Sequence, residues 1–420
     1  MRKRGSLHLH LHLYLAGAVA ARAGDEMTGP ALMLAGYAVA GSTVEASSLL
    51  AGITISAVVG GPVLGALLDR AQRPGRLLAG ALLMYATGLA VLLVSLGRIP
   101  FTVTLLIAVV TGLLGPALSG GWTAQLPRVA LGDHLPRANA LDAMTFNVAS
   151  LAGPALAGGV AEAWGAPSAV VASVALIGLA LPAAWVLPAR PAGPARVVRA
   201  RGGHATSATS VITDLAAGMR TIVSKPALAR ATLGSVVSCV ATGMLMACIP
   251  LLGERVLGGA GRGAMLLACA AVSALAANAA LVRFPRSVTP DTSMWAGILL
   301  QAGGLALAAT GSSGSPTVLI AGVLMTGMGE GPQLTALFAI RHRESPEHLR
   351  GQIFTTGASL KITGFALGTA AAGPLVTWSL PGTLALAASV AACAALACLA
   401  MKSGELPRPC GQHRGQQPPT

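Results

Sequence analysis

Five charged residues lie inside long apolar stretches of this chain, where a charge is expensive to place. Arg22, Asp25 and Glu26 share the first stretch, and Glu330 and Lys361 lie in two later ones. A charged side chain at the centre of a bilayer costs about 2.5–3.5 kcal/mol even on the milder scales, so such residues serve function or internal pairing. Asp and Glu can bind and release a proton, and a nearby Arg or Lys tunes that equilibrium. The residue types therefore indicate proton-coupled chemistry within a membrane.

The spacing of these residues supports two interpretations. Arg22 precedes Asp25 by three residues and Glu26 by four, so the three can meet on one helix face. Lys361 lies 11 residues beyond Arg350, which is too deep for a loop residue. In the functional interpretation all five residues line a central cavity, and Asp25, Glu26 or Glu330 carries the coupling proton. In the other, they form internal ion pairs that hold a helix bundle together.

Twelve long apolar stretches must position these residues. The chain is 54% hydrophobic and only 10% charged, with a mean hydropathy of +0.71, whereas a soluble protein carries about 25% charged residues. About 20 mostly apolar residues cross a bilayer as a helix. The expected spans are near 11–39, 46–68, 77–97, 101–124, 139–163, 167–188, 229–252, 263–284, 293–311, 316–340, 352–377 and 381–401. We therefore predict an all-α membrane protein with twelve transmembrane helices.

The basic residues predict its topology. Of the 28 Lys and Arg, 23 lie in seven segments: residues 1–8, 69–76, 127–137, 189–230, 283–290, 341–350 and 402–420. The alternate gaps hold only Arg98, Arg255 and Arg262, while Arg22 and Lys361 fit neither group. Because Lys and Arg are retained on the cytoplasmic side, both termini are expected in the cytoplasm and the protein in the cell membrane. The same topology, with contact to anionic lipid, explains the net charge of +14 better than binding to nucleic acid does.

The first 23 residues also have the pattern of a secretory signal, with a basic start, an apolar core and a small-x-small end. Cleavage there would leave Met27–Ala40, which is too short to cross a bilayer. We therefore expect an uncleaved first helix, although a start codon assigned too far upstream would also explain the unusual N-terminus.

The chain divides into two similar halves. We expect a six-helix bundle at 1–188, a cytoplasmic linker at 189–228, a second six-helix bundle at 229–403 and a cytoplasmic tail at 404–420. Apolar residues at helical spacing between Val211 and Val223 predict an amphipathic linker helix on the membrane surface. Gly-Pro pairs recur in corresponding helices about 215–220 residues apart, at 115–116 and 331–332 and at 153–154 and 373–374. Pseudo-symmetric halves of this kind are typical of secondary transporters.

The segment from Gly65 to Arg76 carries a resemblance to a known family. It contains Gly65, Asp69-Arg70 and Gly75-Arg76 in that order, and it resembles the loop between helices 2 and 3 of the major facilitator superfamily, with two extra residues between the Asp-Arg and Gly-Arg pairs. The resemblance covers nearly the whole chain and implies that family's twelve-helix fold. It implies that Asp69 approaches the start of helix 11, and that the basic residues form ion pairs that break when the halves rock. A simple positive-inside loop is the alternative.

A second motif is similar to that of exporters within the superfamily. Gly153-Pro154 is followed by Gly158-Gly159 in the fifth span, with three residues between the pairs where the usual form has two. A Pro bend and close Gly packing explain it equally well. Residues 101–124 contain no charge, whereas proton-coupled drug exporters of the superfamily often carry an Arg there.

We therefore expect a secondary active transporter rather than an enzyme: a monomer that exports a small amphipathic molecule in exchange for protons. An uptake symporter or a facilitator of the same fold is the first alternative, and a membrane-embedded enzyme or sensor is the second. No G-x-x-x-x-G-K-[ST] sequence for ATP occurs. No cofactor or metal is expected either, because the six Cys lack metal-site or disulfide spacing.

Overall fold

The structure is a computed structural model that describes residues 2–40, 43–130, 132–189, 208–258, 262–284 and 287–403, and these residues contain helices and no strand. The first half comprises α1 (Arg2–Ala40), α2 (Thr43–Arg70), α3 (Pro74–Ser95), α4 (Phe101–Gly112), η1 (Gly115–Ala117), α5 (Gly120–Thr123), η2 (Leu126–Arg128), η3 (Gly132–His134), α6 (Leu135–Trp164) and α7 (Ala166–Trp185). The second comprises α9 (Ala208–Ser224), α10 (Pro226–Leu257), α11 (Gly263–Arg283), α12 (Pro290–Gly311), α13 (Pro316–Glu344), η5 (Glu347–Leu349), α14 (Arg350–Trp378) and α15 (Leu380–Ser403).

Within the described part of the chain, nine segments are long and apolar enough to cross a membrane. The long helices α1, α13 and α14 are not among them. These are the helices that contain Arg22, Asp25 and Glu26, then Glu330, and then Lys361. Their length of 29 residues or more is ample for a span. The three long helices outside this set are therefore the ones that carry the five charges singled out in the sequence.

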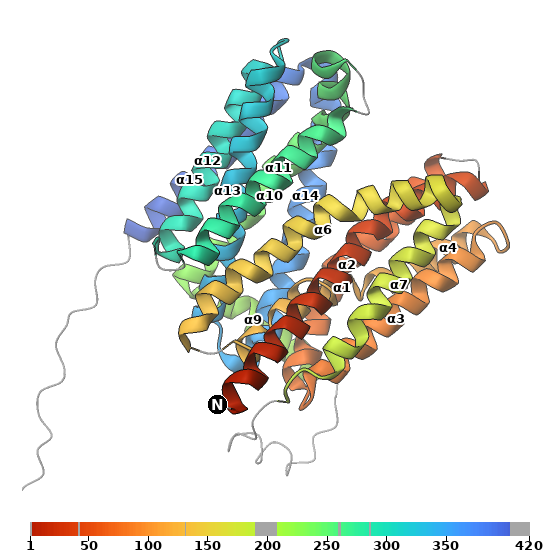
Figure 1. Ribbon diagram of the computed structural model, residues 1–420, viewed down its shortest axis with the longest axis vertical. Helices are drawn as coiled ribbons and strands as arrows, with labels where there is room; N and C mark the ends of the chain where they lie inside the picture. Colours follow the sequence, from red (N-terminus) through yellow and green to blue (C-terminus); the bar gives the residue numbers. More distant parts are fainter. Residues whose placement is uncertain are drawn as a thin grey trace, which may run out of the picture.

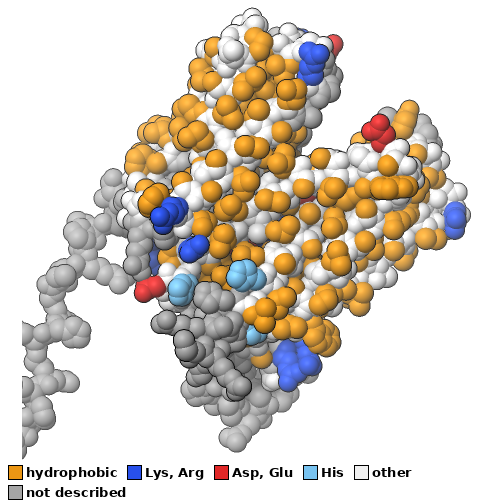
Figure 2. Space-filling view, viewed as in Figure 1, with side chains coloured by type: hydrophobic (Ala, Val, Ile, Leu, Met, Phe, Trp, Pro, Cys, Tyr) orange, Lys and Arg blue, Asp and Glu red, His pale blue; other side chains and the backbone are white. Residues whose placement is uncertain are grey.

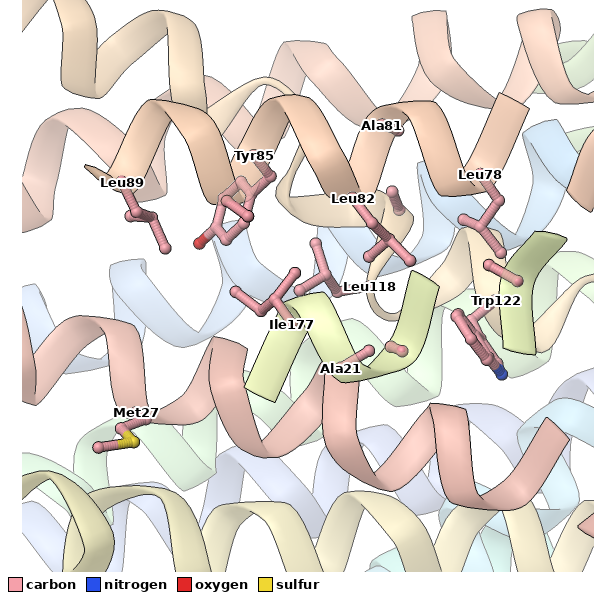
Figure 3. Packing of buried hydrophobic residues seen from close by; sticks show 14 of the residues in the cluster. Ala21, Met27, Leu78, Ala81, Leu82, Tyr85, Leu89, Leu118, Trp122 and Ile177 are labelled. Atoms are coloured by element: carbon pink, nitrogen blue, oxygen red, sulfur yellow. The ribbon is translucent and has the colours of Figure 1, made fainter. Parts of the chain in front are cut away.

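Each half buries its own apolar core. In the first half, α3 packs on α7 and α1 packs on both α6 and α7. Figure 3 shows Leu82 and Tyr85 of α3 pointing towards Ile177 of α7. In the second half, α12 packs between α13 and α15, and α10 packs against α14 and α15. Small residues in these helices allow the close approach that a bilayer-embedded bundle requires.

The two bundles meet along α2–α14 and α6–α11. Figure 1 shows them converging near α9 and the N-terminus and diverging towards the opposite end, and Figure 2 shows the resulting notch between two arms covered with hydrophobic side chains. We call these the closed end and the open end. The α2–α3 loop, η3, η5 and α9 lie at the closed end. The α3–α4 and α10–α11 connections lie at the open end.

The fourth span differs from the single helix expected at 101–124. It ends as an α-helix at Gly112 and continues through the short pieces η1, α5 and η2. Pro116 lacks an N–H for the helical ladder, and Gly120 lies so close to the backbone of Phe354 that a side chain would not fit. The matching Pro332 is instead accommodated inside the continuous α13. The repeated motif therefore gives different local structures in the two halves.

The linker helix is present as α9, which ends at Ser224 before α10 begins at Pro226. Ile222 is buried with Leu228, Leu349 and Ile353. Met219 and Val223 are exposed. One side of α9 therefore packs on the protein at the closed end, while apolar residues remain on its surface. The remainder of the expected linker (residues 190–207) and the tail from 404 lie outside the described residues.

Candidate functional site

A buried ion pair joins α1 to α6. Nη1 of Arg22 lies 2.9 Å from Oδ1 of Asp142, and both side chains are almost completely buried. Thr123 donates a hydrogen bond of 2.9 Å to the other carboxylate oxygen, and Tyr14 donates one of 2.9 Å to Oδ1. Arg22 also donates to the hydroxyls of Thr123 and Thr145. A buried carboxylate and guanidinium that are both hydrogen-bonded in this way are well compensated for their loss of hydration.

This arrangement corrects two expectations from the sequence. Arg22 is directed towards Asp142 and, among the described residues, forms no ion pair with Asp25 or Glu26. The span expected near 139–163 would put Asp142 at a helix N-terminus, but α6 begins at Leu135, so Asp142 lies two turns inside it. The physical reason is the greater gain from a carboxylate that also accepts from Tyr14 and Thr123.

An aromatic layer crosses from one bundle to the other at the depth of this ion pair. The guanidinium of Arg22 lies 3.7 Å from the ring centroid of Phe146. Phe146 contacts Phe338 of α13 at 5.6 Å between centroids, and Phe338 contacts Phe354 of α14 at 6.1 Å. The ring of His342 lies 4.4 Å from that of Phe354. This aromatic layer (Phe146, Phe338, Phe354 and His342) therefore joins α6 of the first bundle to α13 and α14 of the second.

The α1 carboxylates lie on the open side of the aromatic layer. Glu26 is one helical turn beyond Arg22, about 6 Å nearer the open end, and its side chain is exposed. Its backbone packs on α6, because a Cβ on Gly153 would lie only 2.6 Å from the Cβ of Glu26. Asp25 is partly buried and accepts a hydrogen bond of 3.1 Å from Tyr85 of α3. In the described structure, Glu26 forms no hydrogen bond or ion pair.

A pocket in the second bundle holds the other two candidates. Glu330 of α13 and Lys361 of α14 line the same small pocket. The other lining residues come from α10 and α13: Ser235, Ser238, Cys239, Thr242, Gln333, Leu334 and Leu337. Glu330 is eight residues from Phe338 and Lys361 is seven from Phe354, so both lie about 10–12 Å above the aromatic layer. The structure thus brings Glu330 and Lys361 together, and it places Asp25 and Glu26 in the other bundle.

Asp69 connects the bundles at the closed end. Its two carboxylate oxygens accept hydrogen bonds of 2.8 Å each from the backbone N–H groups of Gly351 and Gln352, at the start of α14. These N–H groups have no partner within their own helix, and the helix dipole favours an anion there. The carboxylate is buried. This is the position relative to helix 11 that the family resemblance implied.

The remaining residues of that loop have separate contacts. Gly65 faces the backbone of Gln352 and Gly75 faces the end of α7, and neither position has room for a Cβ. Arg76 is exposed, with its guanidinium 5.0 Å from the ring centroid of Trp185, so it contacts its own bundle. Arg70, at the end of α2, is partly buried. Gly65 therefore allows the close approach of α2 to α14 that brings Asp69 there, and Gly75 allows α3 to pack closely on the end of α7.

The Gly-Pro motif of α6 has only one close contact. Gly153 packs on α1, but a Cβ on Gly158 or Gly159 would meet nothing within 4 Å. Pro154 lies inside the continuous α6 and is exposed. The alternative interpretation, close glycine packing, therefore does not apply to Gly158 and Gly159, because no described atom lies within 4 Å of a Cβ at either position.

Sequence reasoning missed the pairing of Asp142 with Arg22, the hydroxyls around that pair and the aromatic layer. A signal was available: Asn139, Asp142 and Thr145 recur every three residues and are all buried. That spacing places them on one helical face, which is unusual for a membrane-facing helix. The pattern was overlooked because the span was predicted to begin near residue 139, which puts Asp142 at the helix end, whereas α6 begins at Leu135.

The fold and the site define a multi-pass membrane protein whose two helical bundles enclose a partly polar opening. Residues 14–287 match the Major Facilitator Superfamily, and the chain belongs to this superfamily of transporters. A curated relative is the uncharacterized MFS-type transporter y4rN of Sinorhizobium fredii (strain NBRC 101917 / NGR234). It is 28% identical over 373 residues, which cover 86% of this chain and 88% of the relative.

Solved structures share the fold at low sequence identity. A bacterial homologue of the iron transporter ferroportin, in an outward-facing state, has a TM-score of 0.73 and 15% identity, and the match covers 94% of this chain and 99% of that one. The human organic anion transporter MFSD10 (TETRAN) has a TM-score of 0.71 and 14% identity, with coverage of 93% and 99%. The proton:xylose symporter XylE has a TM-score of 0.70 and 13% identity, with coverage of 95% and 96%.

Proposed function

We propose that this transporter exports a small amphipathic molecule in exchange for protons, by alternating access between the two bundles. The observation that carries the proposal is the placement of the α1 carboxylates. Glu26 is exposed on the open side of the aromatic layer, and Arg22, its neighbour on α1, is engaged by Asp142. Asp25 and Glu26 are therefore the proton carriers in this scheme, and the Arg22–Asp142 pair is structural.

The basic segments supply the sidedness. The α2–α3 loop, η5 and α9 lie at the closed end, and the positive-inside rule supports the proposal that this end and both termini face the cytoplasm of a cell-membrane protein. The opening then faces outwards. Asp69 is the gate: its bonds to α14 keep the cytoplasmic side closed and must break when the opposite side closes.

Ionisation of the carboxylates couples the proton to the movement. A charged carboxylate stays hydrated while the opening is filled with water, and closing the bundles over it would incur the cost of burying a charge. A protonated carboxyl can be enclosed more easily. Proton uptake from outside therefore favours closure of the opening, and release to the cytoplasm favours the return. The direction of transport in this proposal, export rather than uptake by symport, rests on the Gly153-Pro154 motif. The fold gives no direction, because a proton symporter and an organic anion transporter share it.

The test is compound-dependent proton flux in inside-out vesicles loaded with a pH-sensitive dye. A panel of small amphipathic amines, carboxylates and zwitterions should include compounds that release protons from the vesicles. Glu26→Gln should reduce that flux at least tenfold, because the amide cannot bind a proton. Glu162→Gln, an exposed position on α6, is the control and should match the parent protein.

Two outcomes would overturn the proposal. Compound movement that ignores the proton gradient would make the protein a facilitator. Proton flux in the same direction as the compound would make it a symporter.

A further inference from the structure

The pocket of the second bundle holds two opposite charges that are not joined. Glu330 and Lys361 line one cavity and interact electrostatically across it. Nevertheless, among the described residues, neither forms an ion pair within 4.0 Å or a hydrogen bond. The first bundle shows what the chain does with a structural pair, since Arg22 and Asp142 lie 2.9 Å apart and are enclosed. Glu330 and Lys361 are therefore available to a ligand of complementary charge.

Several uncharged polar residues of the pocket are hydrogen-bonded within its wall, while among the described residues the hydroxyl of Ser235 has no partner. Ser238 donates to the side-chain oxygens of Gln301 and Gln333, and Gln301 donates to Thr242 at 2.9 Å. This network fixes the wall beside the charges and leaves those residues with little capacity for a ligand. The groups of the pocket that remain available are the carboxylate of Glu330, the ammonium of Lys361 and the hydroxyl of Ser235.

An apolar surface completes the pocket. Leu334 and Leu337 follow Glu330 by four and seven residues on α13, so the three lie on one face of that helix. A ligand held at its charged ends would therefore rest its hydrocarbon part on these two leucines. A ligand with one charge would leave the opposite protein charge uncompensated in a low-dielectric site.

We propose that this pocket binds a small zwitterion, with its carboxylate at Lys361, its ammonium at Glu330 and its apolar part on Leu334 and Leu337. The inference rests on the proposed transport function and specifies the substrate class. Glu330 and Lys361 are then binding residues, and proton carriage belongs to Asp25 and Glu26 in the other bundle.

The test measures binding to the purified full-length protein in detergent, by calorimetry and by the shift of its melting temperature. The probes are L-leucine and 6-aminohexanoate, two zwitterions that differ in charge separation. Each is compared with analogues that lack one charge: N-acetyl-L-leucine and L-leucinamide, and hexanoate and hexylamine. At least one zwitterion should bind, and its two analogues should bind at least tenfold more weakly.

Two variants give a crossed pattern. Lys361→Met should weaken binding of the zwitterion and of the carboxylate-only analogue, and it should leave binding of the amine unchanged. Glu330→Gln should weaken binding of the zwitterion and of the amine, and it should leave binding of the carboxylate-only analogue unchanged. Glu162→Gln should change nothing. If neither zwitterion binds, if single-charge analogues bind equally well, or if both variants weaken all ligands alike, the assignment is wrong. Should a variant fail to fold, the analogue series on the parent protein decides alone.

This experiment is independent of flux. Compound-dependent proton release without zwitterion binding would reject the pocket assignment and leave the export proposal intact. Zwitterion binding without proton coupling would support the pocket assignment and reject the proposal of proton-coupled export.

Discussion

Asp142→Ala is expected to destabilise the first bundle more than any other single change in the site. The substitution leaves Arg22 buried without its carboxylate and removes the acceptor for Tyr14 and Thr123. Removing one partner of a buried pair costs about 3–5 kcal/mol, which is a large part of the 5–15 kcal/mol that holds a typical domain together. The measurement is the melting temperature of the detergent-solubilised protein, with the yield of monodisperse material from size-exclusion chromatography.

Two further variants make this result specific. Glu162→Ala lies on the same helix and is exposed, so it should melt like the parent protein. The double variant Arg22→Met/Asp142→Leu should lower the melting temperature less than Asp142→Ala does, because no charge is left buried alone. A melting temperature of Asp142→Ala equal to that of Glu162→Ala would show that the ion pair contributes nothing.

Asp69→Asn is expected to open the closed end. The amide keeps one acceptor oxygen, but its NH₂ group faces a backbone N–H of α14 that donated to the carboxylate. A hydrogen bond to a charged group is worth about 1.5–3 kcal/mol. A loss of that size shifts the ratio of two conformations roughly ten- to hundredfold, since about 1.4 kcal/mol is tenfold. The population should move from the outward-open towards the inward-open form.

Distances between spin labels in a cysteine-free background measure this shift. One pair, at His134 and His348, reports on the closed end, and a second pair, at Arg98 and Arg262, reports on the open end; all four positions are exposed. In Asp69→Asn the first distance should lengthen and the second should shorten. Arg73→Gln, in the same loop, is the control and should leave both distances unchanged. Unchanged distances in Asp69→Asn would show that this carboxylate is not a gate.

The long-range features of the fold were predictable from the sequence. Hydropathy, the basic segments and the loop from Gly65 to Arg76 led to the two-bundle architecture and to Asp69 at the start of α14. These features follow from the bilayer, which requires apolar spans and a fixed charge sidedness whatever the side-chain packing. The break of the fourth span after Gly112 was not predicted, because it depends on how closely α14 approaches Gly120.

The pairing of charges was less predictable. Arg22 has carboxylates three and four residues away, yet its partner is 120 residues distant. Spacing along a helix says only which residues can meet, while the choice between partners depends on hydroxyls supplied by other helices. The same limit applies to Glu330 and Lys361. Their charges were evident from the sequence, but the pocket that keeps them apart is a property of three packed helices.

The central claim is that the α1 carboxylates control closure of the opening through their charge. The most direct measurement is the distance between spin labels at Arg98 and Arg262 in the parent protein and in the double variant Asp25→Asn/Glu26→Gln. We predict a shorter distance in the variant, because uncharged side chains can be enclosed by the bundles. Acidification should shorten the distance in the parent protein and have no effect in the variant. An unchanged distance in the variant, or a variant that still responds to acid as the parent protein does, would contradict the account.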